Sequence, residues 1–389
     1  MIRREISEII LSKTSQMPVI VVTGPRQSGK TTLVKALFQD YDYVNLEFPD
    51  IRSRAEEDPR LFLTGHKTGL VIDEVQRVPD LLSYIQGIVD ESGKSGSYIL
   101  TGSQNFLLPG QISQTLAGRA ALFHLLPFSL TEISSEYPID DQFTGIAFTG
   151  TYPRIHDRQL KPNDWYPWYI SSYIERDVRQ IEYVKDLNKF QTFLKICAGR
   201  VGQLFNASAI ANEIGVNYKT IQSWISVLEA SFIIFLLQPY YKNFNKRLTK
   251  SPKLYFYDTG LICSLLNIRS ADELSYHYLK GEIFESLIIS EMKKHIAHHN
   301  LQASLYFWRD NSGNEIDCLV DTGARATAAE IKSGTTITSD FFKGLRYWKN
   351  LTGCETDQLA LIYGGTENQH RSNGRVLGWK NVRQVLNHE

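Results

Sequence analysis

Residues 24–31 read Gly-Pro-Arg-Gln-Ser-Gly-Lys-Thr, which is the G-x-x-x-x-G-K-[ST] pattern of a phosphate-binding loop. The two glycines let backbone N–H groups turn toward phosphate oxygens, where a Cβ atom would hinder them. The apolar run 17–22 predicts a buried strand before the loop, and the periodic stretch 32–39 predicts a helix after it. A helix start favours phosphate through its dipole. The stretch therefore predicts an α/β nucleotide-binding domain.

The loop and a later acidic pair predict how ATP and Mg²⁺ are held. Lys30 is expected to reach the β- and γ-phosphates, and Thr31 to offer its hydroxyl to Mg²⁺. An apolar run ends in Asp73-Glu74, where Asp73 would hold the Mg²⁺ shell and Glu74 would polarise the attacking water. The alternative is that the acidic pair only ends a strand. The residues predicted to bind nucleotide are Gly24, Pro25, Arg26, Gln27, Ser28, Gly29, Lys30, Thr31, Thr32 and Asp73, with Arg26 exposed by its position in the loop.

Five short stretches resemble a known family in their order and spacing. They are GPRQSGKT, LVIDEVQ, ILTGSQ, TLAGR followed by LLPFSLTEI, and GTYP near Gly150. They look like prokaryotic ATPases of the AAA superfamily that carry a C-terminal domain of unknown function, over roughly residues 15–335. The phosphate-loop motifs are shared widely, whereas their combination with LAGR and the C-terminal pattern is more specific.

Two more catalytic candidates follow. In AAA-type ATPases a polar residue after the third strand contacts the γ-phosphate or the water, and here Ser103 or Gln104 follows the strand predicted at 97–101. An ordinary turn is the alternative. Arg119 could stabilise transition-state charge, in cis or from a neighbouring subunit, or it could be a surface or ion-paired arginine.

Composition limits the other classes. Lys plus Arg equals Asp plus Glu at 42 each, so net charge gives no global nucleic-acid signal. The four cysteines show no C-x-x-C spacing, which predicts neither a zinc site nor a disulfide framework and fits a reducing cytoplasm. No apolar run reaches about 18 residues, so we expect no membrane span.

The middle of the chain predicts a winged helix. Residues 206–230 read as a helix-turn-helix with Gly215 in the turn, and the two following strands enclose a basic edge that is free of acids from residue 239 to 257. The edge comprises Lys242, Lys246, Arg247, Lys250 and Lys253. The outward residues of the second helix carry one base, so use as a protein-packing module stays open; they are Tyr218, Lys219, Gln222, Ser223 and Glu229. The aromatic stretch 164–173 favours packing over strand binding.

The C-terminal region predicts a helix at 280–295 and a hairpin of strands 315–321 and 326–332. Glu330 and Lys332 share a strand face, and the hairpin can bring Asp317 beside Glu330. With a carboxylate on the helix, Glu285 or less favourably Glu282, this arrangement resembles the PD-(D/E)xK nuclease fold.

That resemblance implies a divalent-metal site of Glu285, Asp317 and Glu330 with Lys332 as a catalytic residue. Ile316 stands where the motif has proline, which weakens its specificity. An ordinary hairpin with exposed carboxylates is the alternative.

Together these patterns predict an α/β protein of three domains. They are a P-loop NTPase domain with a parallel sheet (1–165), a helical and winged-helix region (166–268) and a restriction-endonuclease-like α/β domain (269–389). The expected function is Mg²⁺-dependent ATP hydrolysis by a cytoplasmic, DNA-associated protein whose nucleotide state gates the nuclease-like site. The alternative is an ATP-dependent switch or scaffold with an inactive nuclease-like domain. The expected partners are ATP and DNA; nothing in the sequence separates RNA from DNA, and a homo-oligomer is left open.

Overall fold

The computed structural model describes residues 2–102, 115–174, 186–241 and 249–386. The chain divides into two compact units. The first comprises Met1–Phe128 with the short segments Ala230–Phe232 and Ala297–Asn300, and the second comprises the rest. In the described ranges no helix is both long and apolar enough to cross a bilayer.

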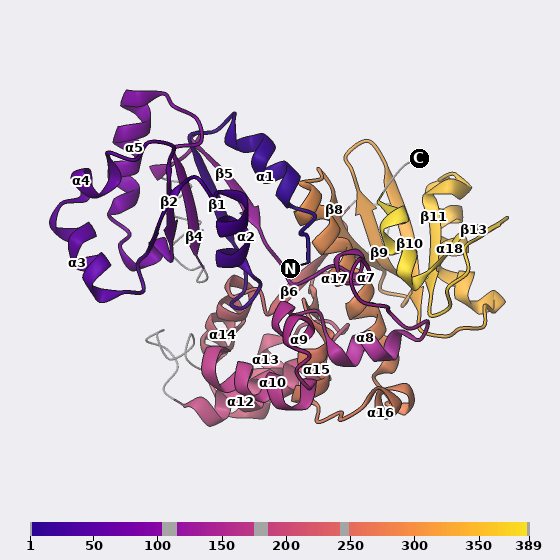
Figure 1. The fold of residues 1–389 in the computed structure, drawn as a ribbon. Helices are drawn as coiled ribbons and strands as arrows, with labels where there is room; N and C mark the ends of the chain where they lie inside the picture. Colours follow the sequence, from indigo (N-terminus) through magenta and orange to yellow (C-terminus); the bar gives the residue numbers. More distant parts are fainter. Residues whose placement is uncertain (1, 103–114, 175–185, 242–248, 387–389) are drawn as a thin grey trace. The chain divides into compact units, whose positions relative to one another are not determined.

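The first unit is built on a five-stranded sheet of order β2-β3-β4-β1-β5, in which every pairing is parallel (Figure 1). This confirms the predicted parallel α/β sheet. Its elements are α1 (Ser7–Thr14), β1 (Val19–Thr23), α2 (Lys30–Leu37), β2 (Asp42–Asn45), α3 (Pro49–Glu57), α4 (Pro59–Leu63), β3 (Leu70–Asp73), η1 (Val75–Arg77), α5 (Leu81–Ser92), β4 (Tyr98–Gly102) and β5 (Ala120–His124).

The central strand β1 shows why both faces of this sheet are covered. All five of its residues are buried. Val19 and Val21 pack in one apolar cluster with residues of α3, α4 and α5, whereas Ile20 and Val22 pack in another with residues of α1 and α2 (Figure 1). A continuous apolar run is typical of a parallel strand buried on both faces.

Strand order determines which residues meet at the carboxyl edge of the sheet. Thr23 at the end of β1 pairs with Gly102 of β4, and Asn45 of β2 pairs with Asp73 of β3. Ile72 pairs with Leu100, so Asp73 lies beside Thr101. The phosphate loop and the acidic pair therefore share one edge, where open α/β sheets bind ligands.

The second unit begins with helices. The two predicted helices of the helix-turn-helix are present as α13 (Ala207–Ile214) and α14 (Tyr218–Ala230). Gly215 ends α13 with φ 72°, the left-handed conformation that glycine adopts without strain. The other helices are α7 (Leu130–Ser134), α8 (Phe143–Thr149), α9 (Pro153–Arg158), α10 (Pro162–Tyr169), η2 (Ile170–Ile174), α12 (Leu187–Gly199), α15 (Thr259–Leu265) and α16 (Ala271–Tyr276).

Most aromatic side chains around α10 pack in the protein interior, as the sequence analysis predicted. Trp165, Tyr166 and Tyr169 are buried and stack around Tyr152, whereas Trp168 is exposed. The charged residues that follow from position 175 lie outside the described ranges.

The second unit also holds an eight-stranded mixed sheet of order β12-β13-β11-β10-β9-β8-β6-β7 (Figure 1). Strands β9 and β10 match the predicted hairpin. The elements are β6 (Ile234–Pro239), β7 (Lys253–Phe256), α17 (Lys280–His299), β8 (Ser304–Arg309), β9 (Glu315–Asp321), β10 (Ala326–Lys332), η3 (Ser339–Phe342), α18 (Lys343–Thr352), η4 (Thr356–Gln358), β11 (Leu359–Tyr363), β12 (Gln369–Arg371), β13 (Gly374–Gly378) and η5 (Trp379–Val385).

Strands β6 and β7 change the predicted domain plan. They form the antiparallel hairpin expected for a wing, but β6 also pairs in parallel with β8. The hairpin is therefore the edge of the eight-stranded sheet, and the predicted boundary at residue 268 divides that sheet. The first unit also ends at Phe128, earlier than the predicted residue 165.

Candidate functional site

The phosphate loop joins β1 to α2 as the sequence predicted. Gly24 has φ 150°, and a Cβ atom there would lie 2.2 Å from the backbone oxygen of Leu125. Gly29 has φ 92° and precedes the first residue of α2. Only glycine fits the first position, so the loop can bring backbone N–H groups close to a ligand.

Two buried side chains give the loop the chemistry of an anion site. Lys30 is buried, and its Nζ donates to the backbone oxygens of Gly24 at 3.0 Å and Pro25 at 2.8 Å. The Ser28 hydroxyl is buried and has no hydrogen-bond partner within the described residues. A buried ammonium and an unsatisfied hydroxyl in a glycine cradle fit a phosphate group.

The remaining loop residues differ in exposure. Arg26 is half-buried rather than exposed, which corrects the sequence expectation. Gln27 has φ 64° and is half-buried, and Thr32 is exposed on the first turn of α2.

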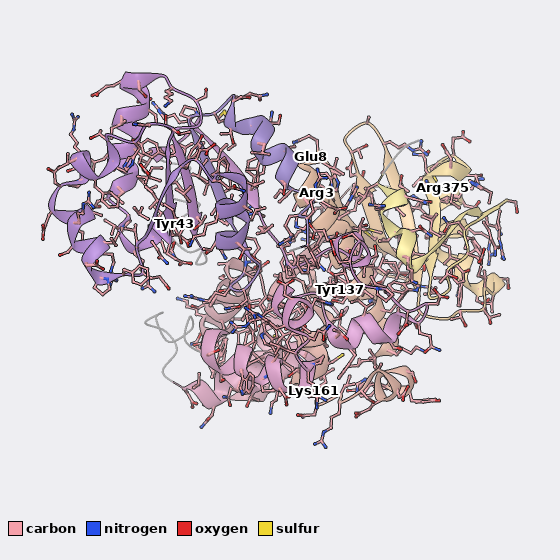
Figure 2. All side chains as sticks on the ribbon, in the orientation of Figure 1. Arg3, Glu8, Tyr43, Tyr137, Lys161 and Arg375 are labelled. Carbon is pink, nitrogen blue, oxygen red and sulfur yellow. The ribbon has the colours of Figure 1, made fainter. Side chains whose placement is uncertain are left out.

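Asp73 is held by three hydroxyl groups. The Thr31 hydroxyl donates to Oδ2 at 2.8 Å, and the Tyr43 hydroxyl donates to the same oxygen at 2.6 Å. Tyr43 is labelled in Figure 2. Thr101 donates to Oδ1. Asp73 itself is only 2% exposed. These contacts bring together the two predicted Mg²⁺ ligands, Thr31 and Asp73.

Sequence reasoning missed Tyr43 and Thr101. Thr101 lies near the carboxyl end of β4, a strand that the sequence predicted, whereas Tyr43 lies in β2, for which no strand was predicted. Their contacts with Asp73 were not predicted because the order of the strands cannot be read from the sequence. Strands β2 and β4 flank β3 only in the folded sheet. Burial, reinforced by Asp73, raises the pKa of Tyr43, so its hydroxyl stays protonated and donates.

Glu74 lies directly after β3 with φ 57°, an unusual conformation for a residue with a side chain. Its carboxylate accepts from the side chain of Gln76, and its backbone N–H lies 3.4 Å from the Thr101 hydroxyl. Glu74 therefore adjoins the Asp73 cluster. Ser103 and Gln104 lie outside the described residues.

Arg119 is not brought to the phosphate loop. It directly precedes β5, and its backbone oxygen accepts from the N–H of Val19 at the opposite end of the parallel strands from the loop. Its guanidinium donates hydrogen bonds to both carboxylate oxygens of Asp90, at 2.5 and 2.9 Å. Within its own unit it is thus the ion-paired arginine of the alternative interpretation, and a role toward a neighbouring subunit stays a prediction.

In the second unit, the hairpin brings Asp317, Glu330 and Lys332 together. Lys332 Nζ lies 2.8 Å from Asp317 Oδ2 and 2.6 Å from Glu330 Oε2. The backbone N–H of Ile331 also donates to Asp317, at 2.8 Å. Asp317 and Glu330 are 8% and 5% exposed, so they are not the exposed carboxylates of an ordinary hairpin.

Glu285 reaches this region from α17 but is paired with a second lysine. Lys253 Nζ lies 3.2 Å from Glu285 Oε1 and also contacts Glu315. The Tyr255 hydroxyl donates to the same Glu285 oxygen. Lys253 is only 4% exposed, so its predicted place on a basic wing edge is wrong: it is a buried ion-pair partner.

Burial and neighbouring charges shift the pKa values of the acidic residues in this cluster. Burial raises the pKa of Glu330 to about 9, with the charge of Asp317 adding to it. Burial likewise raises the pKa of Glu285 to about 7. Burial also opposes the ionisation of Asp317, but Lys332 and Lys253 outweigh it and hold the Asp317 pKa below its usual range.

The metal site predicted at Glu285, Asp317 and Glu330 stays a prediction, and its carboxylates are paired with lysines. Among the described residues, Glu285, Asp317 and Glu330 do not form a group of three ligand atoms within 4.8 Å of one another. Lys253 pairs with Glu285, and Lys332 pairs with Asp317 and Glu330, so a cation would have to compete with these lysines. Glu285 and Lys332 line an open pocket of about 300 Å³, as does Glu282.

The helix-turn-helix presents a small polar face. Tyr218, Lys219 and Gln222 are exposed on α14, and Gln222 donates to the Tyr218 hydroxyl at 3.0 Å. Glu229 does not point outward as predicted, because its carboxylate accepts from the backbone N–H of Leu236 at 3.2 Å. Of the predicted wing residues, Lys242, Lys246 and Arg247 lie outside the described ranges.

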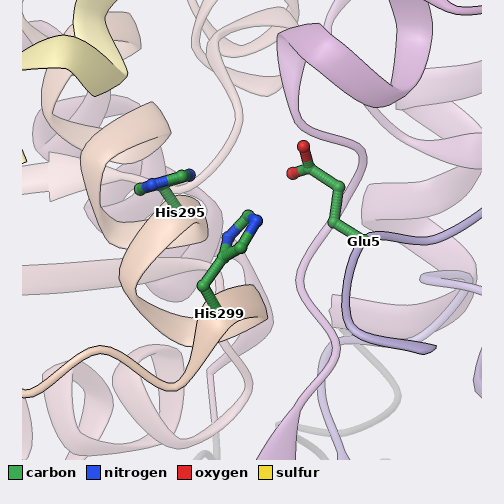
Figure 3. Close-up of side chains that lie close together, drawn as sticks. All are labelled: Glu5, His295 and His299. Carbon is green, nitrogen blue, oxygen red and sulfur yellow. The ribbon is translucent and has the colours of Figure 1, made fainter. Parts of the chain in front are cut away.

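Histidines on α17 form a further group of polar side chains. His295 and His299 project from successive turns of the helix, and Glu5 is drawn with them (Figure 3). Glu5 and His299 belong to the first unit and His295 to the second, so the three residues carry no metal-site assignment.

Three family models match the chain. Residues 16–134 match an AAA domain, residues 140–272 a domain of unknown function (DUF8612) and residues 280–382 another domain of unknown function (DUF4143). The first match supports an AAA-type ATPase domain. Neither of the other descriptions names a winged helix or a nuclease.

The chain is also similar to uncharacterized proteins of Mycobacterium bovis and Mycobacterium tuberculosis. Each is 28% identical over 371 residues, which cover 95% of this chain and 81% of the relative. A protein of Haemophilus influenzae is 23% identical over 67% of this chain and 72% of its own length. Among solved structures, a Walker-type ATPase of Pyrococcus abyssi aligns with a TM-score of 0.45 and 13% identity, over 68% of this chain and 95% of that one.

Proposed function

We propose that the chain binds and hydrolyses ATP with Mg²⁺ at the phosphate loop. The observation that carries the proposal is the 2.8 Å contact between the Thr31 hydroxyl and the Asp73 carboxylate, directly beside the glycine cradle. Hydroxyl and carboxylate oxygens are the ligands Mg²⁺ prefers in nucleotide sites. The match of residues 16–134 to an AAA domain supports the same activity.

Each residue has a separate task. Bound Mg²⁺ would neutralise charge on the phosphates. Lys30 exchanges its bonds to the loop carbonyls for bonds to phosphate oxygens, and Ser28 gains the partner that its hydroxyl lacks. Asp73 and Thr31 would hold Mg²⁺, and Tyr43 and Thr101 hold Asp73. Glu74, next to this cluster, accepts a hydrogen bond from the attacking water and orients it.

The experiment that tests this activity uses Lys30→Ala in the full chain. Losing a charged donor to phosphate should weaken ATP binding by about 10- to 100-fold. Lys67→Ala, on an exposed loop of the same unit, is the matched control and should bind normally. Titration with a fluorescent ATP analogue measures both. Equal affinity in both variants would remove the phosphate-loop assignment.

For the second unit we propose a nucleic-acid-associated domain that ATP switches and that does not cut. The hairpin that carries Glu330 and Lys332 is compatible with two hypotheses, an active nuclease and an inactive domain that acts as a switch. The lysine pairing of Glu285, Asp317 and Glu330 supports the switch, since these carboxylates are already neutralised without a metal. The polar face of α14 supports contact with a nucleic-acid backbone of low sequence specificity.

A cleavage assay separates the two readings. Wild type and Asp317→Ala are incubated with linear, circular and single-stranded DNA, with Mg²⁺ or Mn²⁺ and ATP. The switch predicts no cleavage by either protein and ATP turnover by both. Cleavage by the wild type that Asp317→Ala abolishes would establish the nuclease instead.

A further inference from the structure

A second pocket of the eight-stranded sheet has a different lining from the carboxylate cluster. Its volume is about 410 Å³, within the range of about 300–1,000 Å³ that is usual for small-ligand sites. Three tyrosines line it together with Asp321 and Arg325; they are Tyr240, Tyr241 and Tyr306. We call it the tyrosine pocket.

The tyrosine pocket is separate from the carboxylate cluster. It lies at the β9–β10 turn, where Asp321 pairs with Ala326. Asp317 is four residues earlier on β9, which is about 13 Å away at about 3.3 Å per strand residue. A ligand in the tyrosine pocket would therefore leave the carboxylate cluster uncovered.

The aromatic walls are partly fixed and partly open. The rings of Tyr240 and Tyr306 are 5.5 Å apart between centroids and tilted by 58°. Tyr240 is also backed by Trp348, with ring centroids 6.5 Å apart. Tyr241 is 62% exposed, so most of its side chain is accessible to a ligand. A rigid wall beside an exposed ring offers a flat ligand a surface to stack on.

The rim of the tyrosine pocket carries one acidic and one basic side chain, Asp321 and Arg325. Asp321 accepts from the backbone N–H of Gly323 at 2.8 Å, and burial, reinforced by the Asp321 charge, raises the pKa of Tyr240. The Asp321 oxygens have lone pairs left for an amino group of a ligand. Arg325 is held by Asp357 at 2.8 Å. Stacking faces with acceptor and donor groups at the edge match the way proteins read unpaired bases.

The surrounding sequence favours a polyanion over a peptide. From Pro239 to Tyr257 the sequence contains no acidic residue, and Lys250, in the described part of this stretch, is exposed. A strand of nucleic acid needs stacking for its bases and positive charge for its phosphates.

We propose that the tyrosine pocket binds an unpaired base of a single-stranded nucleic acid. Tyr241 stacks on the base, Tyr240 and Tyr306 form the wall behind it, and Asp321 accepts from its edge. The proposal rests on the nucleic-acid association proposed above and is independent of ATP hydrolysis. DNA and RNA strands present the same base chemistry to this pocket.

The test measures binding of labelled 12-nucleotide strands to the full chain by fluorescence anisotropy. Tyr241→Ala should weaken binding by about 5- to 100-fold, the range expected for loss of one base–aromatic stack. Tyr241→Phe keeps a ring and should bind like the wild type. Tyr276→Ala is the matched control, because Tyr276 is 91% exposed and lies on α16, outside the pocket.

Two further arms identify the ligand. A strand of abasic residues should lose affinity for the wild type and be insensitive to Tyr241→Ala. Paired DNA and RNA strands of equal sequence show which nucleic acid the pocket prefers. Wild-type binding that Tyr241→Ala leaves unchanged would overturn the pocket and leave nucleic-acid association standing. No binding of any strand, with ATP turnover intact, would overturn both.

Discussion

Two buried aspartates in this molecule have opposite surroundings. Asp73 in the first unit and Asp317 in the second are 2% and 8% exposed; Asp73 ends β3, whereas Asp317 lies within β9. Asp73 receives hydrogen bonds from three neutral hydroxyls. Asp317 receives them from a lysine ammonium and a backbone N–H, with a second lysine close by.

The difference shows that acid content does not by itself make a metal site. Hydroxyl donors orient a carboxylate but leave its charge uncompensated, so a cation that enters gains the full attraction. Ammonium donors supply that compensation in advance, and a cation must displace them. The carboxylate of the proposed Mg²⁺ site is therefore uncompensated in the first unit, whereas Asp317 in the second is paired with a lysine.

The largest expected effect is on the chemistry beside Asp73. Glu74→Gln keeps the shape of the side chain but removes the base that orients water. ATP turnover should fall by about 10²- to 10⁴-fold while ATP affinity stays unchanged. Steady-state hydrolysis and analogue binding measure the two quantities. Glu47→Gln, exposed after β2, is the control, and turnover at the parental rate by Glu74→Gln would show that the water is oriented by another group.

A smaller effect is expected from a hydroxyl that only positions Asp73. Thr101→Val has nearly the same shape but cannot donate to Asp73 Oδ1. Loss of such an outer partner typically weakens metal affinity by about 10- to 100-fold. The Mg²⁺ concentration that gives half-maximal hydrolysis should rise accordingly. Thr68→Val, on an exposed loop, should leave the half-maximal Mg²⁺ concentration unchanged. An unchanged concentration for Thr101→Val would show that Thr101 does not position Asp73.

The smallest effect concerns the pH dependence of the second unit. Burial raises the Glu330 pKa to about 9 from an ordinary value of 4.5, so between these values the folded state holds a proton that the unfolded chain releases. Stability from this proton is complete below about pH 4.5 and falls as pH rises through 9. Glu330→Gln should therefore remove part of the fall in Tm between pH 6 and pH 9.

Each kcal/mol of that loss corresponds to about 2–4 °C for a domain of this size. Glu367→Gln, exposed on the same unit, should keep the wild-type profile. Parallel Tm curves for wild type and Glu330→Gln would mean that Glu330 ionises normally.

Local patterns predicted most of the elements. The strand, loop and helix around Gly24–Thr31 and the hairpin carrying Asp317, Glu330 and Lys332 are as the sequence indicated, because both depend on neighbouring residues.

Contacts set by strand order were not predictable in the same way. Tyr43 and Thr101 meet Asp73 only because β2 and β4 flank β3, and Arg119 lies at the far end because β5 runs parallel to β1. Lys253 was predicted to lie on an exposed wing, because the neighbouring residues do not show that β7 is the edge strand of a larger sheet. Lys253 is buried there.

The most direct test of this comparison is anomalous diffraction from crystals grown with Mn²⁺ and a non-hydrolysable ATP analogue. Mn²⁺ replaces Mg²⁺ at oxygen sites and is visible by its own scattering. We predict a manganese peak beside Thr31 and Asp73, and none among Glu285, Asp317 and Glu330. A peak in the second cluster, or a bound analogue without manganese at Asp73, would contradict the account.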